Sequence, residues 1–208
     1  MIYSNKLNTL LLSGMFSLFL IFGSSCKGDE IELDFCEPIT CQNGGACDQG
    51  ICGCLSGYEG QFCEIESRSL YYGDYAMIAG DEDCEDVTVL GQTQDPTQLI
   101  PATDDYTLSI TGDPLNIFGL ILTNTDDPSL FTATATIDDG VITIADQDVG
   151  EQTVQGNVIT VSASGSGSLS GNNITLNLTK TRTVSITIPV IGAQTVQAVC
   201  TQVQNGVK

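Results

Sequence analysis

The sequence predicts a mainly β protein in two parts, a small disulfide-rich module followed by an antiparallel β-barrel, with a β-sandwich as the alternative for the second part. Six closely spaced cysteines lie between residues 36 and 63. From residue 69 onward apolar and polar residues alternate with a period of two, which is typical of half-buried strands. No window in this second part has a convincing helical period.

The first 25 residues have the features of a secretory signal peptide. Lys6 precedes an apolar run at residues 10–22. This run is too short for a spanning helix, which needs about 20 apolar residues to cross a bilayer, and it suits the apolar region of a signal peptide. We therefore expect export and exclude residues 1–25 from the fold.

Cys26 is the candidate lipidation site. It follows Gly23, Ser24 and Ser25, and this run of small residues resembles the lipobox of bacterial lipoproteins, whose cysteine is acylated and becomes the mature N-terminus. The chain has nine cysteines, of which six lie in the module and two in the β domain, so Cys26 is left without a partner. The alternative is ordinary cleavage near Ser25, which would release a soluble secreted protein.

Residues 26–35 form an acidic tether between the expected anchor and the first module. The stretch carries Asp29, Glu30, Glu32 and Asp34, and it resembles the surface-export signals of some Gram-negative lipoproteins. The resemblance implies a protein anchored by lipid in the outer membrane and displayed at the cell surface. A plain solvated linker is the alternative interpretation.

The charge of the chain excludes nucleic acid as a partner. The formal net charge is -20, from 26 acidic and 6 basic residues. Phosphate backbones are bound through clusters of Lys and Arg, which this chain lacks. Cations, basic partners and neutral ligands such as glycans remain compatible with the charge.

The module at residues 36–64 carries six cysteines with four, five, four, one and eight residues between them. They are Cys36, Cys41, Cys47, Cys52, Cys54 and Cys63. This spacing, with the glycines of residues 43–45 and 57–60, resembles an epidermal-growth-factor-like domain. A segment this short cannot bury a core, so disulfides are expected to hold the fold.

Fifteen pairings of six cysteines are possible, and the residues alone do not choose among them. The family resemblance implies that the first cysteine pairs with the third, the second with the fourth and the fifth with the sixth. The expected disulfides are Cys36 with Cys47, Cys41 with Cys52, and Cys54 with Cys63. The acidic pattern of calcium-binding members of the family is absent before Cys36, so no metal is expected here.

The β domain at residues 69–208 is expected to contain eight to ten short strands. Alternating runs cover residues 106–111, 131–137, 174–179, 184–188 and 195–203, and turn residues separate them at 138–140, 156–157 and 170–173. Residues 162–170 alternate Ser with Ala and Gly. They fit either a strand beside a close neighbour, which we favour, or a flexible segment.

A disulfide between Cys84 and Cys200 would join the beginning and the end of this domain. An up-and-down barrel brings its first and last strands together, as such a bond requires. Residues 71–75 faintly resemble the opening of lipocalin-like barrels, which implies a lumen that is either filled or open to one ligand. An immunoglobulin-like sandwich would usually bury a tryptophan, and this chain has none.

The composition argues against catalysis and for binding. Histidine is absent, which removes Ser-His-Asp and Cys-His arrangements. The acidic residues at 81–86, 104–105, 126–127 and 138–139 are expected in solvated turns, and the run at 146–151 is a weak match to a calcium loop.

We therefore expect an envelope lipoprotein that is not an enzyme and has no cofactor or metal. Its β domain and module would bind a small molecule, a glycan or a partner protein. The alternatives are a glycan hydrolase that uses two carboxylates and a purely structural envelope protein.

Overall fold

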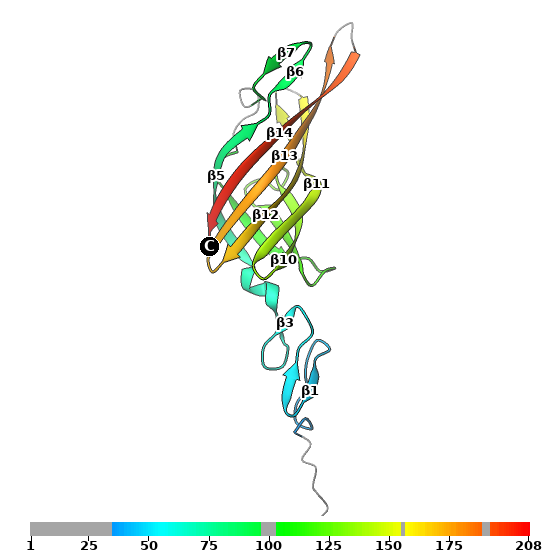
Figure 1. The fold of residues 1–208 in the computed structure, drawn as a ribbon, viewed down its shortest axis with the longest axis vertical. Helices are drawn as coiled ribbons and strands as arrows, with labels where there is room; N and C mark the ends of the chain where they lie inside the picture. Colours follow the sequence, from blue (N-terminus) through cyan, green and yellow to red (C-terminus); the bar gives the residue numbers. More distant parts are fainter. Residues whose placement is uncertain (1–34, 97–102, 155–156, 189–191) are drawn as a thin grey trace, which may run out of the picture.

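The computed structural model describes residues 35–96, 103–154, 157–188 and 192–208. The chain forms a small cysteine-rich module followed by a β-barrel, and the two lie one after the other along the long axis (Figure 1). The expected signal peptide, Cys26 and residues 26–34 of the tether lie outside the described residues. In the part that is described, no helix combines the length and the apolar character needed to cross a membrane.

The module consists of two short hairpins joined by disulfides. Strand β1 (Ala46–Asp48) pairs with β2 (Ile51–Gly53), and β3 (Tyr58–Glu59) pairs with β4 (Ile65–Glu66). The disulfides join Cys36 to Cys47, Cys41 to Cys52 and Cys54 to Cys63. These are the pairs that the epidermal-growth-factor-like spacing implied.

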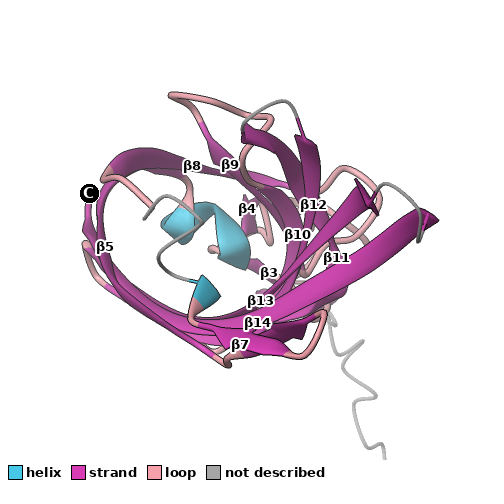
Figure 2. Cartoon of the chain, turned by 90° about the horizontal axis from the view of Figure 1, so that it is seen from above, coloured by secondary structure: helices cyan, strands magenta, loops and turns pink. Residues whose placement is uncertain are grey.

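The second part is a closed ring of eight antiparallel strands, and Figure 2 shows the ring from one end. Each ring strand pairs with the ring strand that follows it along the chain, and the last ring strand, β14, pairs with the first, β5. The prediction of a barrel is therefore confirmed, and the sandwich alternative is wrong. The strands are β5 (Gly73–Cys84), β8 (Tyr106–Gly112), β9 (Gly119–Asn124), β10 (Thr132–Asp138), β11 (Val141–Val154), β12 (Asn157–Ser170), β13 (Asn173–Ile188) and β14 (Gly192–Val207).

A short hairpin outside the ring connects β5 to β8. It is made of β6 (Val87–Val89) and β7 (Gln92–Gln94). The hairpin lies at the end of the barrel far from the module (Figure 1).

The alternation of the sequence decides which side chains fill the barrel. In β10 the threonines are exposed, whereas Ala133, Ala135 and Ile137 are buried. The core also contains Tyr75 and Met77 of β5. All the remaining strands of the ring contribute inward-facing residues to it, with the exception of β14. This is the period-two pattern of a sheet with one face in the core and one in solvent.

Strand β12 is a regular strand rather than a flexible segment. It is hydrogen-bonded to β11 on one side and to β13 on the other. A Cβ atom added at Gly165 or Gly167 would overlap backbone carbonyl oxygens of β13, at Asn177 and Thr175. The glycines therefore allow the close approach of the neighbouring strand.

The end of the barrel nearest the module is closed by a 3₁₀ helix, η1 (Ser67–Tyr71). Arg68 of this helix is buried, and its guanidinium donates to the carbonyl oxygens of Asp113, Asn116 and Gly119 in and beside the β8–β9 loop. The β8–β9 loop also reaches the module, because Ile117 and Phe118 lie beside Gly57. The module is thus joined to the barrel by packed contacts as well as by the chain.

Candidate functional site

A cavity of about 380 Å³ lies at the end of the barrel opposite the module. Its walls include the β9–β10 loop. The other end of the barrel is closed by η1, whose Arg68 contacts Gly119 beside the β8–β9 loop. The volume is at the small end of the range of ligand pockets in proteins. The lining residues are Thr103, Asp104, Asp105, Tyr106, Asn124, Asp126, Asp127, Leu130, Phe131, Val149, Gln152, Val161, Lys180, Arg182 and Gln204.

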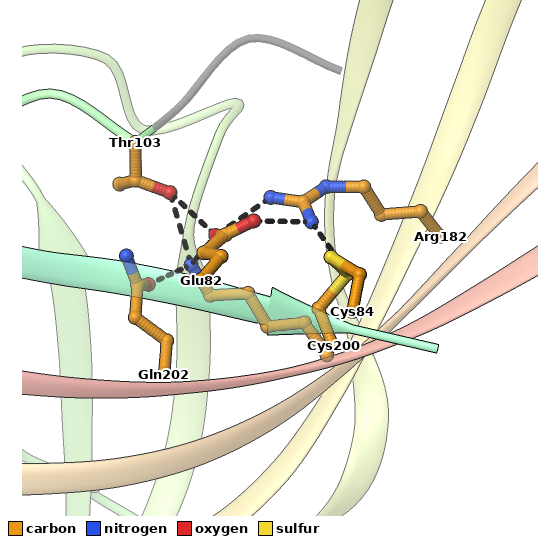
Figure 3. The surroundings of a disulfide bond; sticks show 7 residues. Glu82, Cys84, Thr103, Arg182, Cys200 and Gln202 are labelled. Atoms are coloured by element: carbon orange, nitrogen blue, oxygen red, sulfur yellow. Dashed lines mark hydrogen bonds and ion pairs between the residues drawn. A yellow bond between two sulfur atoms is a disulfide. The ribbon is translucent and has the colours of Figure 1, made fainter. Parts of the chain in front are cut away.

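An ionic cluster of Glu82, Lys180 and Arg182 is buried beside this cavity. Both Glu82 oxygens accept from Arg182, at 2.8 Å from Nη2 and 2.6 Å from Nη1, which makes a bidentate pair (Figure 3). Lys180 Nζ donates to Glu82 Oε1 at 3.1 Å. The side chain of Glu82 is 8% exposed, that of Lys180 is 7% exposed and that of Arg182 is 3% exposed.

A chain of amide side chains extends the cluster along the inner wall. Gln202 Oε1 accepts from Lys180 Nζ at 2.6 Å and from Gln204 Nε2 at 2.7 Å. Gln204 Oε1 in turn accepts from the hydroxyl of Tyr106 at 2.6 Å. Thr103 completes the surroundings of Lys180 by accepting from Nζ and donating to Glu82 (Figure 3). The buried polar groups are therefore held in one fixed arrangement.

A bulge in β5 turns Glu82 toward the interior. The register of β5 against β14 shifts between Ala79 and Glu82, so that two residues of β5 oppose Val203 alone. Before the bulge odd-numbered residues such as Met77 point inward, and after it the even-numbered Glu82 does. A Cβ atom at Gly80 would overlap the carbonyl oxygen of Val203, so the bulge requires a glycine at this position.

The cluster carries two positive charges and one negative charge. Burial is the largest influence on the Glu82 carboxyl and favours its neutral form, but the Arg182 hydrogen bond and the two cations together lower its pKa to about 2. Burial also lowers the pKa of Lys180, and Glu82 opposes that effect. Because Lys180 Nζ has three acceptors, Glu82, Thr103 and Gln202, its geometry is that of an ammonium group. The net charge of the cluster is then +1.

The disulfide between Cys84 and Cys200 adjoins this cluster. Arg182 Nη1 lies 3.4 Å from Cys200 Sγ, and Cys200 is fully buried (Figure 3). Glu82 and the two cysteines bring three ligand-type atoms within 4.8 Å of one another. The two sulfur atoms are bonded to each other and the carboxylate is engaged by two cations, so this group is not arranged to hold a metal ion.

No family model matches this chain. A solved structure of a protein of unknown function from Bacteroides ovatus is similar over 65% of this chain and 47% of its own, at 8% identity and a TM-score of 0.25. This chain therefore spans less than half the length of that protein. A likeness of this size assigns no function, and the site rests on its own geometry.

The acidic residues near the cavity occupy two different environments. Asp104, Asp105, Asp126 and Asp127, here called the rim, are exposed. Three of them accept hydrogen bonds from neighbouring groups: Asp105 from the Ala79 amide, Asp126 from the Thr107 amide and Asp127 from Ser129. The solvated role expected for these four holds.

The same expectation is wrong for Glu82. Asp81, Glu82 and Asp83 lie within strand β5, and Glu82 is buried in the ionic cluster. The acidic run at residues 146–151 lies in β11, where Asp146, Asp148 and Glu151 are exposed. These three carboxylates are not part of the cavity wall.

Sequence reasoning missed Lys180, Arg182, Gln202 and Gln204. A signal for the two cations was present, because Lys180 and Arg182 continue the inward-facing series of Leu176 and Leu178 on β13. A basic residue that occupies an inward-facing position of a strand, in line with core residues, predicts a buried charge. Such a charge needs an oppositely charged partner or marks a functional site.

Proposed function

We propose that this protein is a non-catalytic, lipid-anchored envelope protein whose barrel binds a small molecule. The cavity is the observation that carries the proposal. It combines an apolar wall at Phe131, Val149 and Val161 with polar side chains that hydrogen bonds hold in place, and ligand pockets likewise pair apolar walls with placed polar groups.

The arrangement of the two parts supports a tethered receptor. The chain enters the module from the direction of Cys26, and the barrel follows with η1 nearest the module. The cavity lies at the opposite end of the barrel, because its wall includes Tyr106 at the start of β8 and Asn124 at the end of β9, whereas η1 contacts Gly119 at the other end of β9. If Cys26 carries the anchor, the module holds the cavity away from the membrane. Outer-membrane location and the narrower resemblance to lipocalin-like barrels are part of this proposal.

The binding proposal is tested by filling the cavity. Val161 lines it and is 5% exposed, whereas Val158 on the same strand is 53% exposed. Small molecules that co-purify with the Cys26→Ser chain, prepared without detergent, are measured by mass spectrometry. Val161→Trp should abolish retention, and the matched control Val158→Trp should preserve it.

A second variant protects this test against a folding failure. Leu130 lines the cavity from the exposed β9–β10 loop, so Leu130→Trp should narrow the cavity without overpacking the core. Equal retention by wild type and by both correctly folded cavity variants would reject the barrel as the binding site.

The anchoring proposal has its own experiment. Intact-mass analysis of the protein from its native membrane should find diacylglycerol and an additional acyl chain on Cys26, and Cys26→Ser should release the chain in soluble form. More than one acyl chain is expected because a single chain holds a protein on a bilayer only weakly. An unmodified Cys26 in membrane-derived protein would reject the anchor.

A further inference from the structure

The buried cluster beside the cavity has an uncompensated charge. Lys180 and Arg182 are both buried, and within the described part of the chain the one carboxylate that forms an ion pair with them is Glu82. The four carboxylates of the rim are exposed to solvent, and three of them accept hydrogen bonds from Ala79, Thr107 and Ser129. An unpaired buried charge is costly unless another group compensates it. The cluster therefore favours a ligand that brings one negative charge.

Arg182 also has unused hydrogen-bond donors. Its side chain lines the cavity, and its Nε atom is buried with no hydrogen-bond partner among the described residues. The other two nitrogen atoms of the guanidinium already donate to Glu82, and all three acceptors of Lys180 are in place. Nη1 also donates to Cys200 Sγ, so the Nε–H and the second N–H of Nη2 are the Arg182 donors that remain for an anionic oxygen.

The rest of the ligand should be apolar. Phe131, Val149 and Val161 line the cavity, and a second, smaller groove of about 110 Å³ with Val184 and Val196 in its wall also contacts Arg182. A second negative charge would lie near the rim, whose carboxylates repel it. Given the proposed receptor function, we infer that the barrel binds a small amphipathic monoanion whose charged group contacts Arg182.

Calorimetric titration with four probes tests this inference on the Cys26→Ser chain after removal of co-purified ligand. Octanoate, 1-octanol and octylamine share a tail and differ in charge, and acetate has the charge without the tail. Octanoate should bind at least about tenfold more tightly than octanol or octylamine, as a charge-assisted hydrogen bond implies. Acetate should show no measurable binding.

Charge variants sharpen the test. Arg182→Gln makes the cluster neutral and removes Nε, so the preference for octanoate over octanol should disappear. Lys180→Gln also makes it neutral but keeps Nε, so part of the preference should remain. Glu82→Gln raises the cluster charge to +2 and should strengthen octanoate binding.

Two outcomes overturn the inference and are distinguishable from failure of the receptor proposal. Equal affinity of the wild type for octanoate and octanol would reject the anion while leaving the barrel as an apolar receptor. Binding of none of the probes would also reject the monoanion class, and retention by the Val161→Trp variant then decides separately whether the barrel is a receptor.

Discussion

Cys84 and Cys200 are directly opposite each other in the pairing of β5 with β14, and the same two residues form a disulfide. The covalent bond therefore lies at the seam where the first and last strands of the ring meet. It joins residues 116 positions apart in the chain.

Replacing both cysteines of this disulfide by alanine should strongly destabilise the barrel. The chain-entropy model gives about 4.7 kcal/mol for a loop of roughly a hundred residues. Urea unfolding of the double variant measures the loss. Replacing Cys54 and Cys63 instead should leave the barrel transition unchanged, because that disulfide lies wholly within the module. A barrel transition equal to the wild type in the Cys84 and Cys200 variant would contradict the prediction.

Acid should weaken the fold through Glu82. Its pKa is about 2 in the folded protein against an ordinary value of 4.5, so the unfolded chain binds this proton more readily. The stabilisation is complete above about pH 4.5 and is lost as the pH falls toward 2, up to about 3 kcal/mol in total. Urea unfolding between pH 5 and pH 2 should show a smaller loss of stability in Glu82→Gln than in wild type. Parallel curves for the two proteins would refute this role.

The contact between η1 and the β8–β9 loop depends on Arg68. Arg68→Met leaves the carbonyl oxygens of Asp113, Asn116 and Gly119 without this donor, and a loss of about 2–4 kcal/mol is expected. Glu66→Gln is the matched control, because the Glu66 side chain is 39% exposed and its ion pair with Arg68 should contribute less than about 1 kcal/mol. Equal unfolding free energies for the two variants would show that the carbonyl contacts are unimportant.

The close approach of β12 and β13 should not tolerate a side chain at Gly165. In Gly165→Val the Cβ atom would meet the Asn177 carbonyl oxygen, so the strands must separate at a cost of about 1–3 kcal/mol. Ser166→Val, at the next and exposed position, should change stability by less than about 0.5 kcal/mol. Thermal unfolding compares the two variants, and a neutral Gly165→Val would argue against the close approach.

Much of the barrel could be predicted because its strands obey a simple alternation. The run at residues 106–111 corresponds to β8, and the run at residues 131–137 to β10 with a shift of one residue. The sequence also predicted the turn between β10 and β11. In the structure Asp139 and Gly140 both have the positive φ that a tight hairpin needs.

The ionic cluster could not be predicted in full, because a bulge reverses the inward and outward positions of β5. An alternation counted from Tyr75 and Met77 places Glu82 on the outer face, yet it lies inside. The register shift becomes visible only when β5 is paired with β14. Lys180 and Arg182, by contrast, follow the alternation of β13 without interruption.

The pairing of β14 with β5 also affects how neighbouring copies of the protein can interact. An open sheet ends in a strand whose free amide and carbonyl groups can recruit another chain, and this is a common start of aggregation. Within the described ring, each of the eight strands has a neighbour on both sides. An edge of this kind remains where β11 beyond Thr143 and β14 before Cys200 pair with a single strand of the ring, so these two stretches are where another chain could add to the sheet.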